Sequence, residues 1–132
     1  MVAADSAGQC HVYKLKNSEE LELMQKMEAH NDYILKCLIS PDVSLMATCS
    51  ADKTVKIWNL IPNKGYVLNK TLYGHSRWVW DCAFSWGKVE YIVTGSTDSF
   101  AKIWQIDTGE TLRVLKEHTK GINCLAMNDV PI

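Results

Sequence analysis

The sequence predicts an all-β protein assembled from a repeated unit of four short strands. The first observation is an internal repeat, because SADKTVKIWNL at 50–60 returns 46 residues later as STDSFAKIWQI at 96–106. The second is a set of three histidines, His30, His75 and His118, spaced 45 and 43 residues apart. The third is that the apolar runs between these landmarks are short and rich in β-branched and aromatic residues. Turn-forming residues separate the runs, which is typical of strands.

The chain begins with three strands of an incomplete unit in residues 1–29. The stretches AADSAGQCHVYKL and LELMQKM supply what we expect to be the second, third and fourth strands of that unit. Residues 18–28, SEELELMQKME, are rich in Glu and Leu, which favour a helix. Their position in the repeat is that of an outer strand, however, and we let the repeat outweigh the helix propensity.

Two complete units follow, at residues 30–73 and 74–117. The strands predicted in the first are 34–40, 45–50, 54–60 and 66–72. Those predicted in the second are 78–85, 91–96, 100–106 and 111–116. The remaining residues, 118–132, supply a single inner strand, GINCLAMN at 121–128. The expected strand count is therefore three, four, four and one.

Composition and charge exclude several classes of protein. A chain of 132 residues with 47% apolar content suits one small domain with a packed core. Fourteen basic and fifteen acidic residues give a net charge of -1 without a basic block, so we expect neither nucleic acid nor an anionic membrane as partner. The sequence has no apolar run of about 18 residues and no signal-peptide pattern, so we expect no membrane insertion and a cytoplasmic location.

The five cysteines are expected to be buried free thiols. They are odd in number, far apart and surrounded by apolar residues, and no CxxC pair occurs. A metal site built from His75 and Cys82 would imply an identical second site at His30 and Cys37, since both pairs are seven residues apart. We therefore predict no disulfide framework, no metal and no cofactor.

Four short motifs resemble the WD-repeat family, whose members fold as β-propellers. These are Gly-His at 74–75, Ser-Pro-Asp at 40–42, Ala-Asp-Lys-Thr-Val-Lys-Ile-Trp at 51–58 and the copy of the last that ends at Trp104. The dipeptide that names the family is altered here, to Trp-Asn and Trp-Gln. The resemblance implies a propeller fragment of about three blades, part of a ring that in this family normally has seven.

The resemblance also implies a buried hydrogen-bond relay in each complete blade. By matching position, the relay residues are His30, Thr48, Asp52 and Trp58 in one blade and His75, Thr94, Asp98 and Trp104 in the other. A His, an Asp and a hydroxyl are also the parts of a hydrolytic triad. Because the set occurs twice at the repeat spacing, we interpret it as architecture and predict no catalytic residue.

Side chains at the start of each inner strand and near the tight turn are expected on the top surface, which usually binds proteins in this family. They are Tyr33, Leu35 and Ala51, then Trp78, Trp80 and Thr97, and finally Gly121 and Asn123. Val79, Cys82 and Phe84 are expected to point into the blade stack instead. Uncharged aromatic residues on one rim are typical of a protein interface. The alternative, that Trp78 and Trp80 fill the central channel or pack between blades, stays open.

A narrower resemblance involves YILKC at 33–37, ATCSADKTVKIW at 47–58, RWVWDCAFS at 77–85 and IDTGE at 106–110. These segments are similar to the C-terminal blades of the G-protein β-subunit-like proteins, the small WD-repeat subunits of the TOR kinase complexes. The resemblance implies a non-enzymatic scaffold that binds and stabilises a TOR-type kinase domain. The turn SWGKVE at 85–90 and the short loop at 61–70 depart from that pattern.

Two other functions of β-propellers would leave different features in the sequence. A substrate receptor of a ubiquitin ligase would show basic residues on the top surface and an adaptor motif upstream. A propeller hydrolase would show one unrepeated constellation of acids.

A chain of this length is too short to close such a ring. We therefore expect it to be part of a longer protein and, in isolation, to self-associate. One route is for the last strand of one copy to pair with the first three strands of another, which would remove open sheet edges.

Overall fold

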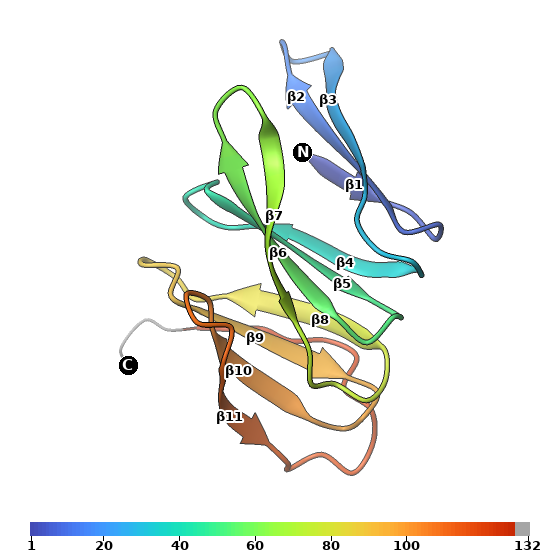
Figure 1. Cartoon of the computed structure of the whole chain (residues 1–132), viewed down its shortest axis with the longest axis vertical. Coiled ribbons are helices and arrows are strands. Elements are labelled where there is room, and N and C mark those ends of the chain that lie inside the picture. Colours follow the sequence, from blue (N-terminus) through green and yellow to red (C-terminus); the bar gives the residue numbers. More distant parts are fainter. Residues whose placement is uncertain (129–132) are drawn as a thin grey trace.

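The computed structural model describes residues 1–128 and arranges them as three antiparallel sheets lying one against the next (Figure 1). Sheet 1 contains three strands, β1 (Val2–Ala4), β2 (Gln9–Leu15) and β3 (Leu21–Glu28). Sheet 2 contains four, β4 (Ile34–Ile39), β5 (Leu45–Ser50), β6 (Val55–Ile61) and β7 (Gly65–Leu72). Sheet 3 contains β8 (Val79–Phe84), β9 (Tyr91–Ser96), β10 (Ala101–Gln105) and β11 (Thr111–Leu115). Residues 1–128 form no α-helix, and so none that is long and apolar enough to cross a membrane.

Each sheet is a meander in which every strand pairs with its neighbour in sequence. The innermost strand β4 packs against β1 of sheet 1 and β8 of sheet 3, whereas β3, β7 and β11 lie on the outside (Figure 1). The same turn follows the second strand of both complete sheets, with a non-glycine residue at positive φ, Lys53 (74°) or Ser99 (70°). The fold predicted from the repeat, all-β with blades of three, four and four strands, is confirmed.

The segment with the strongest helical propensity is a strand. Residues Leu21–Glu28 form β3, which pairs with β2 over its whole length, from Gln9 opposite Glu28 to Leu15 opposite Leu21. Since the edge of β2 offers a partner to every β3 residue except Met24, which lies at a register shift, tertiary pairing outweighs the preference of Glu and Leu for a helix.

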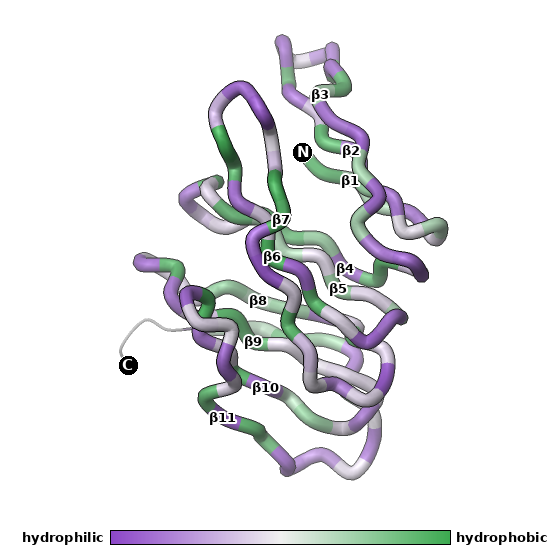
Figure 2. Tube along the Cα trace, in the orientation of Figure 1, coloured by the Kyte–Doolittle hydropathy of each residue, from purple (hydrophilic) through white to green (hydrophobic). Residues whose placement is uncertain are grey.

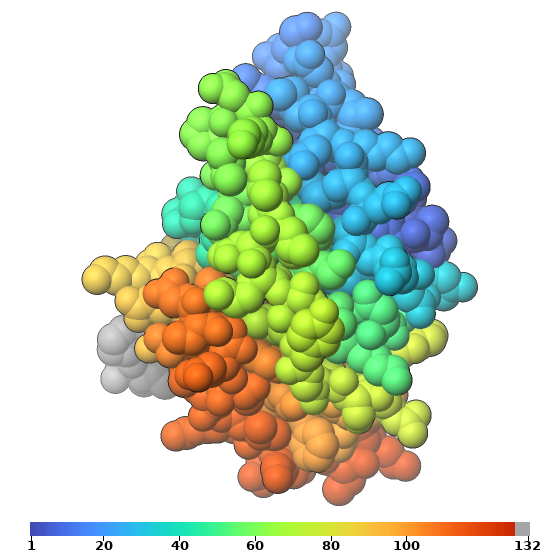
Figure 3. Space-filling view, viewed as in Figure 1, coloured from blue at the N-terminus to red at the C-terminus, as the bar shows by residue number. Residues whose placement is uncertain are grey.

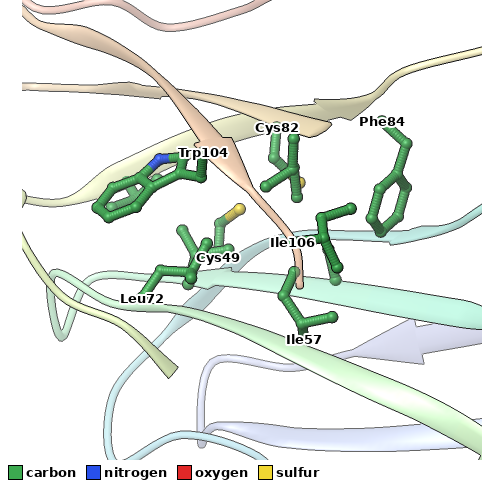
Figure 4. Close-up of a cluster of buried hydrophobic side chains, with 11 residues drawn as sticks. Cys49, Ile57, Leu72, Cys82, Phe84, Trp104 and Ile106 are labelled. Carbon is green, nitrogen blue, oxygen red and sulfur yellow. The ribbon is translucent and has the colours of Figure 1, made fainter. Parts of the chain in front are cut away.

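The larger core lies between sheets 2 and 3 (Figure 4). Sheet 2 contributes Ala47, Cys49, Val55, Ile57 and Leu72, and sheet 3 contributes Val79, Cys82, Phe84, Ile92, Trp104 and the adjoining Ile106. All of these side chains are at most 8% exposed. Residues Val79, Cys82 and Phe84 therefore point into the stack, as expected. Both faces of a middle sheet are covered in this arrangement, which explains why its strands are nearly continuous apolar runs.

A smaller core joins sheets 1 and 2, and consists of Cys10, Ala29, Met46, Trp58 and Tyr66. Burial raises the pKa of the Cys10 thiol to about 12, so this group behaves as an apolar side chain. All five cysteines are free thiols. The expectation that all five are buried is wrong for Cys124, which is exposed because it lies outside the three sheets, and Cys37 on β4 is only partly buried.

A side-chain clamp connects the outer strands of sheets 1 and 2. The Gln25 amide donates from Nε2 to the Tyr66 carbonyl oxygen (2.8 Å), and the Tyr66 N–H donates to Gln25 Oε1 (2.8 Å). The neighbouring Gly65 has φ +81°, and a Cβ at this position would lie 2.3 Å from Gln25 Oε1. Glycine is therefore needed at 65 both for the backbone conformation and for the approach of the amide.

Hydrophilic residues cluster in the turns at the ends of the sheets, whereas the strands carry most of the hydrophobic residues (Figure 2). The outer strand β7 forms a ridge between sheet 1 and the turn that follows β10 (Figure 3). At this seam Lys70 Nζ donates to the Asp107 carbonyl oxygen (2.8 Å). The same lysine stem lies against Gly109, where a Cβ would come within 2.8 Å of Lys70 Cδ.

The segment after sheet 3 differs from the prediction of an inner strand at 121–128, because no strand forms there. Its start nevertheless packs on sheet 3. The Ile122 N–H donates to the Ser96 carbonyl oxygen (2.9 Å), and the Ile122 side chain is buried over Gly95. A strand needs a neighbouring strand to satisfy its backbone groups, and the rest of residues 1–128 supplies no second strand for this unit. Residues 129–132 of the predicted unit lie outside the described residues.

Candidate functional site

The first group of predicted site residues forms a continuous hydrogen-bond chain inside sheet 2. Trp58, on β6, donates from Nε1 to Thr48 Oγ1 on β5 (3.0 Å). This hydroxyl lies 2.8 Å from Nε2 of His30, which follows β3. The other ring nitrogen, His30 Nδ1, lies 2.7 Å from Oδ2 of Asp52 in the β5–β6 turn. Thr54 also donates its backbone N–H and its hydroxyl to Asp52 Oδ1, at 2.9 and 2.6 Å.

The second group repeats this geometry in sheet 3. Trp104 Nε1 donates to Thr94 Oγ1 (2.8 Å), Thr94 Oγ1 lies 2.7 Å from His75 Nε2, and His75 Nδ1 lies 2.8 Å from Asp98 Oδ2. The imidazole of His75 also packs edge-on against the Trp104 ring, with 6.1 Å between centroids. The structure therefore brings together all eight residues of the two predicted sets, four in each sheet.

The position of each proton follows from the charge state of the groups. Burial lowers the pKa of both histidines below the ordinary value, although the neighbouring carboxylate works against this shift. Burial works to raise the pKa of Asp52 and Asp98, but hydrogen bonds outweigh it and lower both values. At neutral pH a neutral imidazole therefore faces a carboxylate, which can only accept. Each Nδ1 carries the proton, and each Nε2 accepts from the threonine hydroxyl.

Burial separates these sets from a catalytic triad. The side chains of Thr48 and Thr94 are completely buried, so their hydroxyls cannot reach a substrate. Each hydroxyl also has both a donor and an acceptor partner within 3.0 Å. Among residues 1–128, no three His, Cys, Asp or Glu side chains come together as metal ligands would. The geometry is that of polar groups satisfying one another inside a packed sheet.

The second candidate site is an aromatic cluster at the seam between sheets 2 and 3. The rings of Trp78 and Trp80 lie 5.8 Å apart, and Tyr33 from the preceding blade meets Trp78 edge-on at 6.4 Å. Tyr33 is 50% exposed and Trp78 is 42% exposed. Trp80 is partly buried, and its Nε1 donates to Thr97 Oγ1 (2.7 Å). We call Tyr33, Trp78, Trp80 and Thr97 the aromatic rim.

A β-bulge at the same place in both inner strands sets the direction of these side chains. The pairing of β8 with β9 shifts between Val79 and Asp81, which leaves Trp80 unpaired. The pairing of β4 with β5 shifts between Ile34 and Lys36, which leaves Leu35 unpaired. Strict alternation would place Trp80 on the same face as Cys82 and Phe84. The bulge re-aims Trp80 and lets Val79 share the buried face instead.

Other predicted surface residues lie apart from the rim. Leu35 is partly buried, and Asn123 and Gly121 are exposed on the segment after sheet 3. Ala51 is only 3% exposed, so its assignment to the surface is wrong. It directly follows β5, and its N–H donates to the Tyr33 carbonyl oxygen, which draws this residue in between two strands.

Two basic residues beside the rim were not predicted. Lys53 and Arg77 line a cleft of about 770 Å³ together with Ser76, Trp78, Trp80 and Thr97. Arg77 directly precedes Trp78 in the sequence, which is the one signal that could have indicated it. Lys53 comes from the tight turn of the preceding blade, and no sequence pattern relates this turn to Trp78.

Comparison with known proteins agrees with this architecture. The family described as "WD domain, G-beta repeat" matches residues 21–59 and 66–105. The protein belongs to the WD-repeat family, and its three sheets are blades of a β-propeller.

The relatives described below are all named as subunits of a target of rapamycin complex. It is 43% identical over 135 residues to the target of rapamycin complex subunit wat1 of Schizosaccharomyces pombe, covering 100% of this chain and 42% of the relative. It is 41% identical over 133 residues to the target of rapamycin complex subunit LST8 of Saccharomyces cerevisiae, covering 98% of this chain and 43% of the relative.

A third relative is the "Non-functional target of rapamycin complex subunit LST8-2" of Arabidopsis thaliana, 50% identical over 90 residues, which cover 64% of this chain and 28% of the relative. The chain thus spans less than half the length of these relatives.

Proposed function

We propose that the chain is part of a non-catalytic scaffold that binds a TOR-type kinase domain through the aromatic rim. The observation that carries this proposal is the exposure of the rim. Rings from two adjacent blades, Tyr33 and Trp78, remain half-exposed although each blade has a well-filled core beneath them. Large, rigid aromatic side chains that remain accessible at a seam have the composition of an interface hot spot.

The names of the relatives support the choice of partner. Both yeast proteins are described as subunits of a target of rapamycin complex, and each is matched over at least 98% of this chain. The name of the plant relative shows that 50% identity by itself does not fix activity. The proposal therefore rests on the rim together with the names, and the remaining blades would belong to a longer protein whose ring has seven.

The alternative of a ubiquitin-ligase receptor is less well supported. The sequence criterion against it was the lack of basic residues on the top surface, and the structure places Lys53 and Arg77 beside the rim. Charge therefore no longer separates the two functions. The names of the relatives favour the TOR complex, and we retain that assignment.

The proposal has three further parts, which concern catalytic activity, cellular location and self-association. The absence of catalytic activity is supported by the burial of both relay hydroxyls. The cytoplasmic location stays a prediction. Self-association of the isolated chain is supported by β1, which among the described strands pairs with β2 alone and has no strand partner at its other edge.

A substitution of Trp80 tests the proposed partner. We expect Trp80→Ala to weaken binding of a purified TOR-type kinase domain by roughly 30-fold or more, the loss typical of an aromatic hot spot. Trp86→Ala is the matched control, because Trp86 is 70% exposed and lies after the opposite end of β8. A separation of six residues, as between Trp80 and Trp86, corresponds to about 20 Å along an extended strand.

The measurement is a titration of the immobilised kinase domain with each variant. Circular dichroism should show that both variants remain folded. Unchanged affinity for Trp80→Ala, or an equal loss for Trp86→Ala, would contradict the assignment of the rim.

A further inference from the structure

The cleft beside the aromatic rim combines aromatic surface with positive charge. Its lining residues are Lys53, Ser76, Arg77, Trp78, Trp80 and Thr97, so two of the six are cations and none is an acid. Lys53 comes from the β5–β6 turn of sheet 2, and the other five come from sheet 3 and its loops. The cleft therefore spans the seam between two blades.

The charges of Lys53 and Arg77 are not neutralised within the described part of the chain. Neither forms an ion pair among residues 1–128. Two turn carboxylates lie near them: Asp52 is next to Lys53 in sequence, and Asp98 accepts from the N–H of Ser76, next to Arg77. Both face the relay histidines instead, and their side chains are only 20% and 3% exposed. Asp52 also accepts from the N–H of Thr54, and Asp98 accepts from the N–H groups of Ser76 and Phe100. These two carboxylates are thus directed toward the relay histidines, whereas the two cations line the cleft.

The walls of the cleft are held in place by hydrogen bonds. The Ser96 hydroxyl donates to the Trp78 carbonyl oxygen (2.8 Å), and the Thr97 N–H donates to the same oxygen (3.0 Å). The indole of Trp80 is fixed by its bond to Thr97 Oγ1. Lys53 is anchored through its backbone N–H, which donates to the Ser50 carbonyl oxygen (3.3 Å). The Trp80 indole and the backbone of these walls are already fixed, so they lose little conformational entropy on binding, which favours affinity.

We propose that this cleft binds an extended protein segment in which an apolar side chain is flanked by Asp or Glu residues. The apolar side chain would lie against the faces of Trp78 and Trp80. One carboxylate would pair with the guanidinium of Arg77, whose planar donors suit two parallel hydrogen bonds, and another would pair with Lys53. This inference rests on the proposed function, because the partner that carries the segment is the kinase domain proposed above.

Two separate cations on different blades suit two separate carboxylates better than a polyanion. A nucleic acid or an anionic membrane would require a broad basic surface, and the net charge of -1 argues against one. Charge complementarity of this kind acts mainly on association rate and specificity, so binding should depend on ionic strength.

Charge reversal at the two cations is the test. The kinase domain is titrated with the unmodified chain, with Lys53→Glu/Arg77→Glu, and with the control Lys88→Glu/Arg113→Glu at 50 and 300 mM salt. The control changes the net charge equally at exposed residues outside the cleft lining. We expect the cleft variant to bind about 10- to 100-fold more weakly at low salt and to regain part of this loss at high salt, because salt screens the new repulsion between like charges, while the control stays within about twofold. Lys53→Gln/Arg77→Gln should show a smaller loss in the same direction.

The outcomes distinguish this inference from the proposed function. If Trp80→Ala weakens binding and the charge reversal does not, the acidic segment is wrong and the rim remains the binding surface. If neither changes the affinity, the proposed function is wrong. An equal loss for the control variant would overturn the inference by showing an effect of net charge alone. Loss of binding after phosphatase treatment of the kinase domain would also overturn it, because the anion would then be a phosphate.

Discussion

Replacing Thr94 by valine should destabilise the fold strongly although the two side chains have nearly the same shape. The Thr94 hydroxyl is the central link of the sheet 3 relay, since it accepts from Trp104 and donates to His75. Thr94 itself is 0% exposed, Trp104 is 2% exposed and His75 is 7% exposed. Water therefore cannot replace the lost hydroxyl, and the change leaves one buried donor and one buried acceptor without partners.

The expected magnitude follows from these two groups. A buried polar group without a partner costs about 1–3 kcal/mol, so the two together should reduce the free energy of unfolding by about 2–6 kcal/mol. A domain is typically stable by only about 5–15 kcal/mol, so the loss is a large fraction of the total. Thr94→Ser keeps the hydroxyl and removes one methyl group, and should therefore retain much more stability than Thr94→Val.

Urea unfolding followed by tryptophan fluorescence measures this effect as a fall in the transition midpoint at constant slope. The matched control is Thr111→Val, because Thr111 is exposed on the outer strand β11 and the same change there should stay within about 0.5 kcal/mol. A Thr94→Val protein that loses no more stability than Thr111→Val would refute the assignment of the relay as a stabilising network. In a double-mutant cycle with Trp104→Phe, which removes the indole donor, the two losses should not add.

Three other predictions can be checked on the same material. Because burial lowers the pKa of both relay histidines, the unfolded chain binds more protons than the folded chain below about pH 6.5. Stability should therefore be constant above about pH 7 and fall as the pH drops below about 6.5, by up to about 1.4 kcal/mol per pH unit for each histidine. A flat profile of the unmodified chain would contradict the prediction. Gly65→Ala should lower the urea midpoint more than Gly87→Ala, because both glycines have positive φ (81° and 77°) but only the first would also meet a side chain; equal losses would remove the role of the interblade clamp. Light scattering of the isolated chain should show a mass that rises with concentration, and a monomer mass at every concentration would argue against self-association through the β1 edge.

The architecture was predictable because the same order of strands and turns occurs twice in the sequence, at 30–73 and 74–117. The strands of sheets 2 and 3 follow from apolar runs at fixed distances from His30 and His75. Even the strand β3 could be identified against its helical propensity, because its place in the repeat was known. The eight relay residues meet as the family pattern implies, since each occupies a fixed register position and hydrogen bonding inside a closed stack admits few arrangements.

The candidate binding surface was only partly predictable. Trp78 and Trp80 were identified from their place at the start of an inner strand, yet alternation along a strand would bury one side chain in two. The bulge at Trp80 decides its direction, and it is visible only in the pairing of β8 with β9. Ala51 failed as a surface residue for a related reason, since a hydrogen bond from its backbone to Tyr33 draws it between strands.

The amino-acid sequence contains the fold of each blade because a blade depends on local periodicity, turn residues and a short list of buried polar groups. Inspection of the sequence does not show which residues of adjacent blades lie side by side, since this depends on the twist and packing of whole sheets. Lys53 and Arg77 are 24 positions apart in the sequence, and nothing in the intervening residues indicates that the two cations line one cleft. The packing of sheets 2 and 3 brings them together beside the tryptophans, and only this packing indicates the chemistry of the proposed partner.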